Sequence, residues 1–515
     1  MEFQAGDPIY AIVAYDDAYV QPLIVAALKA LIPESRLRLL SVEKTPDDDV
    51  SLATLLPSPG GKMLQIAAYE QIDFGHAAAH PRTTLVNSYV IRKALIRKHF
   101  LSATVDHWLA KHPDSVLGRH VRRSEAFEVD YAEFLDDALV EAFDLRASLE
   151  RNEGAGSGAA WREEDKGEKE EEDKDSPRPQ QYDDGDGSDG SDGADSAGEG
   201  GLLPAAAREW WILKPGMSDR GQGIRLFSTM AELQAIFDGW EADQPDSDDE
   251  AHDEGVEGVA GAAHPTWQAT DAAAGDGGGA EPGHDYITTS HLRHFVAQPY
   301  VHPPLLHGGR KFHVRTYVVC VGALRVYVFR EMLALFAAAP YRPPWETTDL
   351  AAHLTNTCLQ GEGAKEDSVR RFWDLGALGG GGGGSSSSSS TAGRAPGGEI
   401  SKEDIFASVC AVTGDVFEAA ARGMVVHFQP LAHAFEAFGL DFLVDGAGTP
   451  WLLEVNAFPD FRQTGGGLRA VVAEFWAGAL RLAVGPFAGL PEEADAGGGD
   501  AAAMVLVREV DLGRR

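Results

Sequence analysis

Cysteine is scarce in this sequence, and the three cysteines are Cys320, Cys358 and Cys410. None of them belongs to a CxxC pair, so neither a disulfide framework nor a zinc knuckle is predicted. A reducing, cytoplasmic environment fits this cysteine usage best. Apolar runs of roughly 18 residues are also absent, and the N-terminal MEFQAGDPIY has no basic segment followed by an apolar stretch. We therefore expect no signal peptide and no membrane partner.

Basic residues are few as well, since 44 Lys and Arg stand against 80 Asp and Glu, which gives a net charge of -36. Residues 162–200 carry 16 acids and 5 bases, and residues 241–285 carry 13 acids and no Lys or Arg. Such segments bury too little apolar surface to offset the entropy of ordering, so we expect disordered acidic inserts at 150–200 and 241–285. A third insert at 376–399 contains pure glycine and serine runs typical of flexible linkers. We expect no direct nucleic-acid partner.

The remaining sequence is long and apolar enough for more than one domain, since 515 residues include 44% hydrophobic side chains. Residues 10–15 and 36–42 resemble strands and residues 20–31 a helix, which predicts a small α/β domain at 1–84. The spacing of apolar residues predicts a helix over 85–109. We expect a central subdomain at 85–297, a C-terminal subdomain at 298–490 and a tail at 491–515. The fold class is thus α/β (α+β).

The segment 441–456, DFLVDGAGTPWLLEVN, has the pattern of a hairpin that joins two strands through a Gly-rich turn. A turn centred near 447–448 places Asp441 opposite Glu454, and Asn456 lies on the same face because strand side chains repeat every second residue. Three oxygen ligands on one face suit Mg²⁺ that bridges nucleotide phosphates. The alternative is an ordinary polar hairpin at a sheet edge, although the apolar neighbours Phe442 and Leu452 favour burial.

Residues 210–227, WWILKPGMSDRGQGIRLF, read as a strand, a glycine-bearing loop and a second strand. Lys214 ends the first strand, and the glycines allow the loop to approach phosphate groups closely. No GK[ST] sequence follows, so this is not a Walker A loop. Residues 295–300, FVAQPY, form an apolar strand that ends at a proline and could hold an adenine edge through its backbone.

Residues 310–320, RKFHVRTYVVC, alternate in polarity, with Lys311, His313 and Arg315 on one face of a strand. A hairpin partner is expected at 323–330. The basic row could clamp phosphate oxygens. The alternative is a solvent-facing edge strand that is protected by its charges.

Residues 85–123 carry eight basic residues and only two acids, a local charge of +6 in an acidic chain. This pattern is typical of a solvated helix face, and the alternative is a cradle for phosphate or for an acidic polypeptide.

Taken together, the order of these motifs resembles the tubulin–tyrosine ligase family, whose members have the ATP-grasp fold. The segment HLTNTCLQ at 353–360 is closely similar to the family's HLTN segment. EAFGLDFLVD and WLLEVNAFP match its metal-binding end, and LVNSYVIRKALIRK resembles its lysine-bearing helix. The resemblance runs from about residue 10 to about residue 465, interrupted by the three inserts, and is closest to a divergent fungal branch that includes a processing-body-associated member.

The resemblance implies an ATP-dependent carboxylate–amine ligase that uses ATP and two Mg²⁺ ions. It implies catalytic roles for Lys311, Arg315 and Asn356. Contacts to ATP are implied for Lys98, Lys214, Gln298, Tyr300, Val301, Lys311, Arg315 and Thr355. Metal binding is implied for Asp441, Glu454 and Asn456. The expected reaction adds an amino acid, tyrosine by resemblance, to a carboxylate of tubulin or another acidic protein tail through an acyl phosphate. Addition of Glu or Gly chains remains open.

Two positions depart from the family pattern. The family's KFD-x-R strand has an acid where this chain has His313, and Leu335 stands where the family has an arginine. Both changes are expected at the acceptor side rather than at the metal site. They motivate an alternative function, a catalytically degenerate ATP-binding module that interacts with proteins of cytoplasmic mRNA-decay bodies.

Overall fold

The computed structural model describes residues 7–15, 17–40, 56, 61–154, 202–216, 223–242, 294–355, 368–379, 400–461, 466–491 and 503–513. Most of the three expected inserts lies outside these residues, as do Asn356 and Cys358. Their edges differ from the expectation, however. Helices α8 (Phe143–Asn152) and α9 (Met230–Ala242) extend into the first two ranges, and Leu378 forms an isolated bridge with Ile400 at the third. These edges are ordered because their apolar residues join folded elements.

The N-terminal region forms a parallel sheet of four strands in the order β2-β1-β3-β4. The strands are β1 (Ile9–Ala14), β2 (Leu37–Leu40), β3 (Lys62–Ala67) and β4 (Thr84–Val86). Helix α1 (Gln21–Leu31) connects β1 to β2, as the sequence predicts, and the short helices η1 (Tyr69–Gln71) and α3 (Phe74–Ala79) connect β3 to β4. The Asp73 side chain caps α3 by accepting from the backbone N–H of His76.

The continuous helix predicted over 85–109 is wrong at its start. Leu85 and Val86 belong to β4, so the first sheet runs past the expected boundary at residue 84. Both side chains are buried, and a strand buried on both faces has the same continuous apolar run as a buried helix. The helical part is divided into α4 (Lys93–Ile96) and α5 (Lys98–Leu109).

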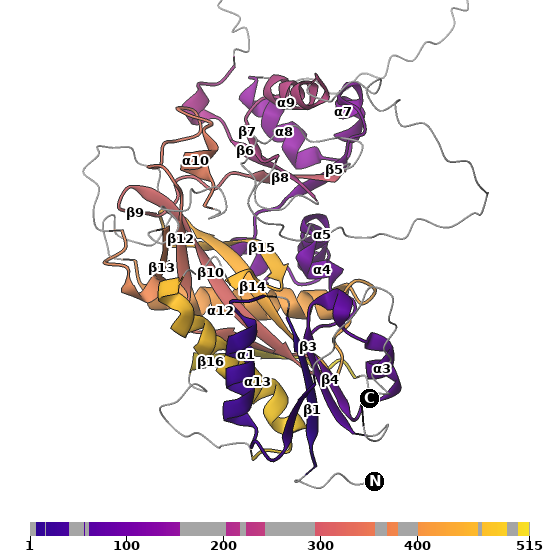
Figure 1. Ribbon diagram of the computed structural model, residues 1–515. Coiled ribbons are helices and arrows are strands. Elements are labelled where there is room, and N and C mark those ends of the chain that lie inside the picture. Colours follow the sequence, from indigo (N-terminus) through magenta and orange to yellow (C-terminus); the bar gives the residue numbers. More distant parts are fainter. Residues whose placement is uncertain are drawn as a thin grey trace, which may run out of the picture.

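The central subdomain is an antiparallel sheet in the order β5-β8-β6-β7, covered by short helices on one side (Figure 1). Its strands are β5 (Glu125–Glu128), β6 (Trp211–Pro215), β7 (Arg225–Phe227) and β8 (His294–Pro299). Its helices are η2 (Ala132–Phe134), α7 (Leu135–Ala138), α8, η3 (Ala205–Ala207) and α9. The short helix α6 (Leu117–His120) packs instead into the core of the C-terminal region through Leu117. Phe237, Trp240 and Phe295 are in mutual ring contact within its core.

The C-terminal region is an antiparallel sheet with the long strand β10 at its centre. Its strands are β9 (Leu306–His307), β10 (Arg310–Val321), β11 (Arg325–Phe329), β12 (Leu333–Phe336), β13 (Val369–Arg371), β14 (Phe435–Val444), β15 (Pro450–Ala457) and β16 (Met504–Glu509). β16 lies within the range expected to be a tail, but it pairs with β11 as an edge strand. The sequence MVLVRE begins with four apolar residues, two of them β-branched valines, which favour a strand.

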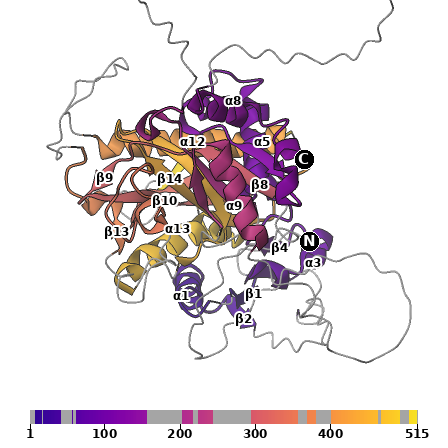
Figure 2. The ribbon, with the colours of Figure 1, turned by 90° about the horizontal axis from the view of Figure 1, so that it is seen from above.

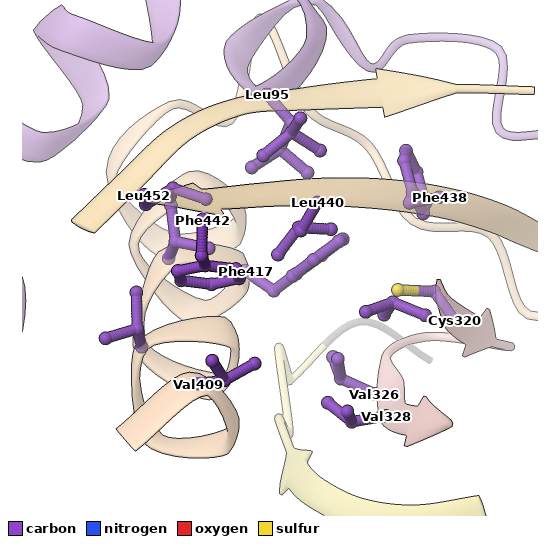
Figure 3. Packing of buried hydrophobic residues seen from close by; sticks show 14 of the residues in the cluster. Leu95, Cys320, Val326, Val328, Val409, Phe417, Phe438, Leu440, Phe442 and Leu452 are labelled. Atoms are coloured by element: carbon purple, nitrogen blue, oxygen red, sulfur yellow. The ribbon is translucent and has the colours of Figure 1, made fainter. Parts of the chain in front are cut away.

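Two long helices cover the two faces of this sheet (Figures 1 and 2). Helix α12 (Lys402–Gly423) begins at Ser401, whose hydroxyl accepts from the N–H of Asp404. Its Phe417 packs among Phe438, Leu440 and Phe442 of β14 (Figure 3). Small helices α10 (Leu350–His353), η6 (Phe372–Asp374) and η8 (Gly466–Leu468) complete the region.

Helix α13 (Arg469–Phe487) lies on the other face beside α1, and both helices share one apolar core with the sheet. Among the described residues α13 is the single helix long and apolar enough to cross a membrane. Its Phe475, Trp476 and Leu480 are fully or almost fully buried against the protein, which is typical of a core helix.

The side chains of β10 alternate between the core on one face of the strand and a cavity on the other. Phe312, Val314 and Val318 point into the core beneath α12, whereas the basic row lies on the other face. Lys311, His313 and Arg315 are only 5%, 4% and 8% exposed. The interpretation of this segment as a solvent-facing edge strand is therefore wrong, because β11, β12 and β14 all pair with β10.

Candidate functional site

A cavity of about 420 Å³ lies between the central sheet and the large sheet. Every predicted site residue that the structure describes lines it: Lys98, Lys214, Gln298, Tyr300, Val301, Lys311, Arg315, Thr355, Asp441, Glu454 and Asn456. The two lysine-bearing elements β6 and α5 meet β8, β10 and the β14–β15 hairpin at this place. Asn356 lies outside the described residues, so its position stays a prediction.

One end of the cavity, which we call the acid end, is formed by the β14–β15 hairpin. Asp441 pairs with Glu454 and Gly439 pairs with Asn456, which confirms the predicted register of the hairpin. The Asn456 Nδ2 atom lies 3.2 Å from Glu454 Oε1 and 3.4 Å from Asp441 Oδ2. The three side chains therefore converge, as expected from strand alternation.

Each carboxylate of the acid end is paired with a cation. Arg315 donates from Nη2 to Asp441 Oδ2 at 2.9 Å and from Nε to Oδ1. Burial alone would raise the pKa of Asp441, but Arg315 and His313 outweigh burial and hold this pKa well below its usual range. Lys98 Nζ lies 3.8 Å from Glu454 Oε2, and this pair is more exposed.

Gly439 lets the chain at Pro459 pack closely beside the ion pair of the acid end. A Cβ atom on Gly439 would lie 3.0 Å from Pro459 Cβ and 3.4 Å from Arg315 Cδ. The tight contact is the one with Pro459, so a larger residue would have to displace the chain at Pro459 beside the buried ion pair.

His313 lies at the acid end, which corrects the expectation that it sits apart from the metal site. Its Nε2 atom is 3.4 Å from Asp441 Oδ1, and its Nδ1 atom is 2.6 Å from Thr355 Oγ1. The reason is the strand register, since β10 pairs Arg315 with Asp441 and brings His313 alongside. Leu335 pairs with His313 on β12 but is buried and is not among the described residues that line the cavity.

A second part of the cavity, which we call the lysine end, has two lysines for which the described residues supply no carboxylate within ion-pair distance. Lys214 Nζ donates to Gln298 Oε1 at 2.9 Å, and Lys311 Nζ donates to the Tyr300 hydroxyl at 3.0 Å. Burial lowers the pKa of Lys214 to about 8, with Glu454 acting in the opposite direction. Burial and the nearby Lys214 lower the pKa of Lys311 to about 7. Such groups gain most from an anion.

His353 is a cavity residue that the sequence pattern did not single out, although it begins the HLTN segment. His353 Nδ1 lies 2.8 Å from the Tyr300 hydroxyl, and its Nε2 lies 2.7 Å from the Thr347 carbonyl oxygen. It lines the cavity together with Tyr300 and Lys311. The motif was a signal for the residue, but its contact with a side chain 53 positions away could not be predicted.

The acid end offers oxygen ligands of the kind that Mg²⁺ prefers, namely two carboxylates and the amide oxygen that Asn456 presents if its side chain is turned. Among the described residues no group of three or more His, Cys, Asp and Glu is arranged for a metal ion. The donor set therefore fits an ion that shares its coordination with phosphate and water, as Mg²⁺ usually does, better than a closed protein site.

Comparison with known proteins gives matches over most of the chain. Residues 201–489 match the model of the "Tubulin-tyrosine ligase family". A Schizosaccharomyces pombe protein named probable tubulin–tyrosine ligase is 37% identical over 92% of this chain and 91% of its own length. The Saccharomyces cerevisiae protein named probable tubulin–tyrosine ligase PBY1 is 36% identical over 82% of this chain. This chain spans 46% of the length of PBY1.

A solved structure is similar over almost the whole chain. It is the C-terminal domain of Pby1 from K. lactis, described as an ATP-grasp enzyme that interacts with the mRNA decapping enzyme Dcp2. The TM-score is 0.57 at 28% identity, and the match covers 98% of this chain and 99% of the other. This likeness confirms the expected ATP-grasp fold and its α/β class.

Proposed function

The chain belongs to the tubulin–tyrosine ligase family, and on this premise we propose that it is an ATP-dependent ligase that joins an amine to a protein carboxylate. The observation that carries the proposal is the cavity itself, because Asp441, Glu454 and Asn456 converge in one part of it, and in another part Lys214 and Lys311 donate to neutral oxygens. A nucleoside triphosphate with Mg²⁺ has the complementary distribution of charge.

In the proposed complex the triphosphate occupies the cavity beside Lys98, Lys214 and Lys311. Cationic side chains in a partly dry cavity stabilise phosphoryl oxygens more strongly than they would in water. Gln298, Tyr300 and Val301 lie at the end of β8 and would line the adenine pocket. This placement is supported by their position on the cavity wall next to Lys214.

Asp441, Glu454 and Asn456 would hold Mg²⁺, which neutralises phosphate charge when it is bound. Arg315 is poised at the boundary between the acid end and the rest of the cavity. It binds Asp441 through two donors, and its other guanidinium N–H groups have no partner among the described residues. Those groups could face the phosphate that is transferred.

The proposed reaction has two steps. An oxygen of the acceptor carboxylate attacks the γ-phosphorus of ATP, ADP leaves, and an acyl phosphate forms. The amine nitrogen then attacks the acyl carbon, phosphate leaves with that carboxylate oxygen, and the nitrogen loses a proton to give the amide. Lys311, Arg315, Thr355 and Asn356 would stabilise the charge that develops in both steps, and positioning supplies much of the remaining rate.

The proposed acceptor is the tail of tubulin or another acidic protein in the cytoplasm. Exposed basic residues near α5 and α6, including Lys111 and Arg119, support an acidic partner by charge complementarity. Tyrosine is the amine that family membership favours. Glu and Gly remain open because no described cavity residue selects among them.

The test is ADP release from ATP with Mg²⁺, tubulin-tail peptides and a panel of amino acids. We expect peptide-dependent turnover that falls roughly a hundredfold or more in Glu454→Gln, since one electrostatic group is lost from the reacting end. Mass spectrometry of the peptide identifies the amide. Absence of amide product with every peptide and amino acid would contradict a ligase.

A second candidate is an ATP-binding interaction module in cytoplasmic mRNA-decay bodies. The likeness to a Pby1 domain described as interacting with Dcp2 supports it, and so do His313 and Leu335. This candidate predicts tight ATP binding without turnover and recovery of decapping proteins by pull-down from cytosol. Recovery of tubulin alone would count against it.

A further inference from the structure

Lys311 is the first member of a buried chain of hydrogen bonds. The chain runs from Lys311 Nζ to the Tyr300 hydroxyl at 3.0 Å, from this hydroxyl to His353 Nδ1 at 2.8 Å, and from His353 Nε2 to the Thr347 carbonyl oxygen at 2.7 Å. Lys311, Tyr300 and His353 are 5%, 8% and 2% exposed, so water does not compete for these contacts.

The contact between His353 and Thr347 sets the direction of every hydrogen bond in this series. A carbonyl oxygen can only accept, so His353 Nε2 must carry a hydrogen. Burial lowers the pKa of His353, which keeps the ring neutral and leaves a lone pair on Nδ1. The Tyr300 hydroxyl must therefore donate to His353 Nδ1. Only the lone pairs of the Tyr300 oxygen are left for Lys311, which donates to it.

Local hydrogen bonds fix Thr347, which is the last member of this hydrogen-bond series. Thr347 belongs to a turn in which its N–H donates to the Pro343 carbonyl at 3.2 Å and its hydroxyl accepts from the N–H of Asp349 at 3.1 Å. Asp349 in turn caps α10, which carries His353, by accepting from the N–H of Ala351 at 3.0 Å. The carbonyl and the imidazole are thus fixed relative to each other.

We infer that His353 is a positioning residue that accepts the hydrogen of the Tyr300 hydroxyl. Tyr300 then presents only a lone pair to Lys311. This arrangement favours the ammonium form of Lys311, which faces the phosphates. The inference rests on the proposed function, because it concerns how Lys311 receives a nucleotide. Without an acceptor at His353, the Tyr300 hydroxyl is free to donate to a neutral Lys311 amine instead. The neutral form would then be favoured.

Several other groups act on Lys311, and a test must keep them constant. The titratable groups that face it or its hydrogen-bond chain from neighbouring elements are Lys214, Tyr300, His302, Tyr341, Asp349 and His353. The terminal phosphate of the nucleotide also titrates near neutrality. Comparison between variants at His353 leaves all of these except His353 in place.

Two substitutions at residue 353 separate the two ring nitrogens. In His353→Asn the side-chain oxygen occupies the position of Nδ1, so an acceptor for Tyr300 is kept and the donor to Thr347 is lost. In His353→Gln the amide reaches the position of Nε2, so the donor to Thr347 is kept and the acceptor for Tyr300 is lost. A purely structural role would not distinguish the two by the pH dependence of binding.

The experiment is calorimetric titration of the full chain with ATP and Mg²⁺ from about pH 6 to pH 9, a range that includes the lowered pKa values of Lys214 and Lys311. We expect wild type and His353→Asn to share one midpoint for the loss of ATP affinity with rising pH. His353→Gln should have a midpoint lower by roughly half a unit to one unit, the equivalent of one hydrogen bond.

Equal midpoints for both variants and wild type, or equal shifts in both, would overturn the inference. If His353→Gln fails to fold, Tyr300→Phe takes its place, because loss of the hydroxyl removes the lone pair and must also lower the midpoint. An unchanged midpoint in Tyr300→Phe would be contrary to the inference as well. Wild type that binds no ATP would instead refute the proposed function, so the two failures are distinguishable.

Discussion

The two ends of the cavity differ in how their charged side chains are paired. At the acid end Asp441 has Arg315 and Glu454 has Lys98, so each carboxylate has a cation beside it. At the lysine end Lys214 and Lys311 donate to the neutral oxygens of Gln298 and Tyr300. The acid end is therefore neutralised by the protein itself, whereas the part of the chain that the structure describes supplies no anion paired with the lysine end.

This difference predicts different consequences for folding and for binding. A buried ion pair is costly to break because the remaining charge stays buried without a partner. Buried lysines without a counter-charge already oppose folding, and they gain from a bound anion. Substitutions at the acid end should thus affect stability most, and substitutions at the lysine end should affect nucleotide affinity most.

The largest effect on stability is expected for Arg315→Met. The substitution leaves Asp441 buried without its partner, so the free energy of unfolding should fall by about 3–5 kcal/mol in urea titration. The matched control is the double variant Arg315→Met with Asp441→Leu, which removes both charges and should recover most of the loss. A single variant within about 1 kcal/mol of wild type would mean that the pair is not the buried contact described above.

Lys311→Met should reduce nucleotide affinity rather than stability. We expect ATP affinity to fall roughly 10- to 100-fold, the equivalent of one charged hydrogen bond, without a loss of stability. Since the folded pKa of Lys311 is lowered to about 7 from 10.5, the folded state binds fewer protons than the unfolded state between these values. Wild-type stability should therefore rise with pH in this window relative to Lys311→Met, by at most about 1.4 kcal/mol per pH unit.

Denaturant titrations of both proteins at several pH values measure this difference. If the difference in free energy of unfolding stays constant from pH 7 to pH 10.5, Lys311 is not the depressed lysine of the cavity. If it falls with pH, Lys311 has an anionic partner in the free protein.

The smallest effect is expected for Lys98→Ala. Its partner Glu454 lies 3.8 Å away, and both side chains are partly open to the cavity. Exposed pairs of this kind contribute about 0–1 kcal/mol, so the midpoint of urea unfolding should hardly move. A loss comparable to that of Arg315→Met would remove the distinction between the two ion pairs of the acid end.

Local patterns explain which parts of the site could be predicted from the sequence. The pairing of Asp441 with Glu454 follows from one hairpin, and the common face of Lys311 and Arg315 follows from one strand. Both depend on short-range geometry with period two. The positions that were wrong or missed depend on long-range pairing. Leu85 completes a sheet that begins at β1, and His313 of β10 meets Asp441 of the neighbouring strand β14.

The same reasoning explains the edge strand β16 and the role of His353. Residues 504–507 are a short apolar run with two valines, but nothing local indicates that β11 is the partner of this strand. His353 contacts Tyr300 because β8 ends where α10 begins to cover the cavity wall. Composition and periodicity contain no information on such contacts. The assignment of Asn356 stays a prediction, because it lies outside the described residues.

The most direct test of the proposed reaction follows the oxygen atoms of the acceptor. A peptide acceptor with ¹⁸O in its reacting carboxylate is incubated with ATP, Mg²⁺ and the amino acid found in the ligation screen, and the released phosphate is analysed by mass spectrometry. Ligation through an acyl phosphate predicts one ¹⁸O atom in each phosphate that accompanies an amide. Phosphate without the label, at equal amide yield, would contradict the account.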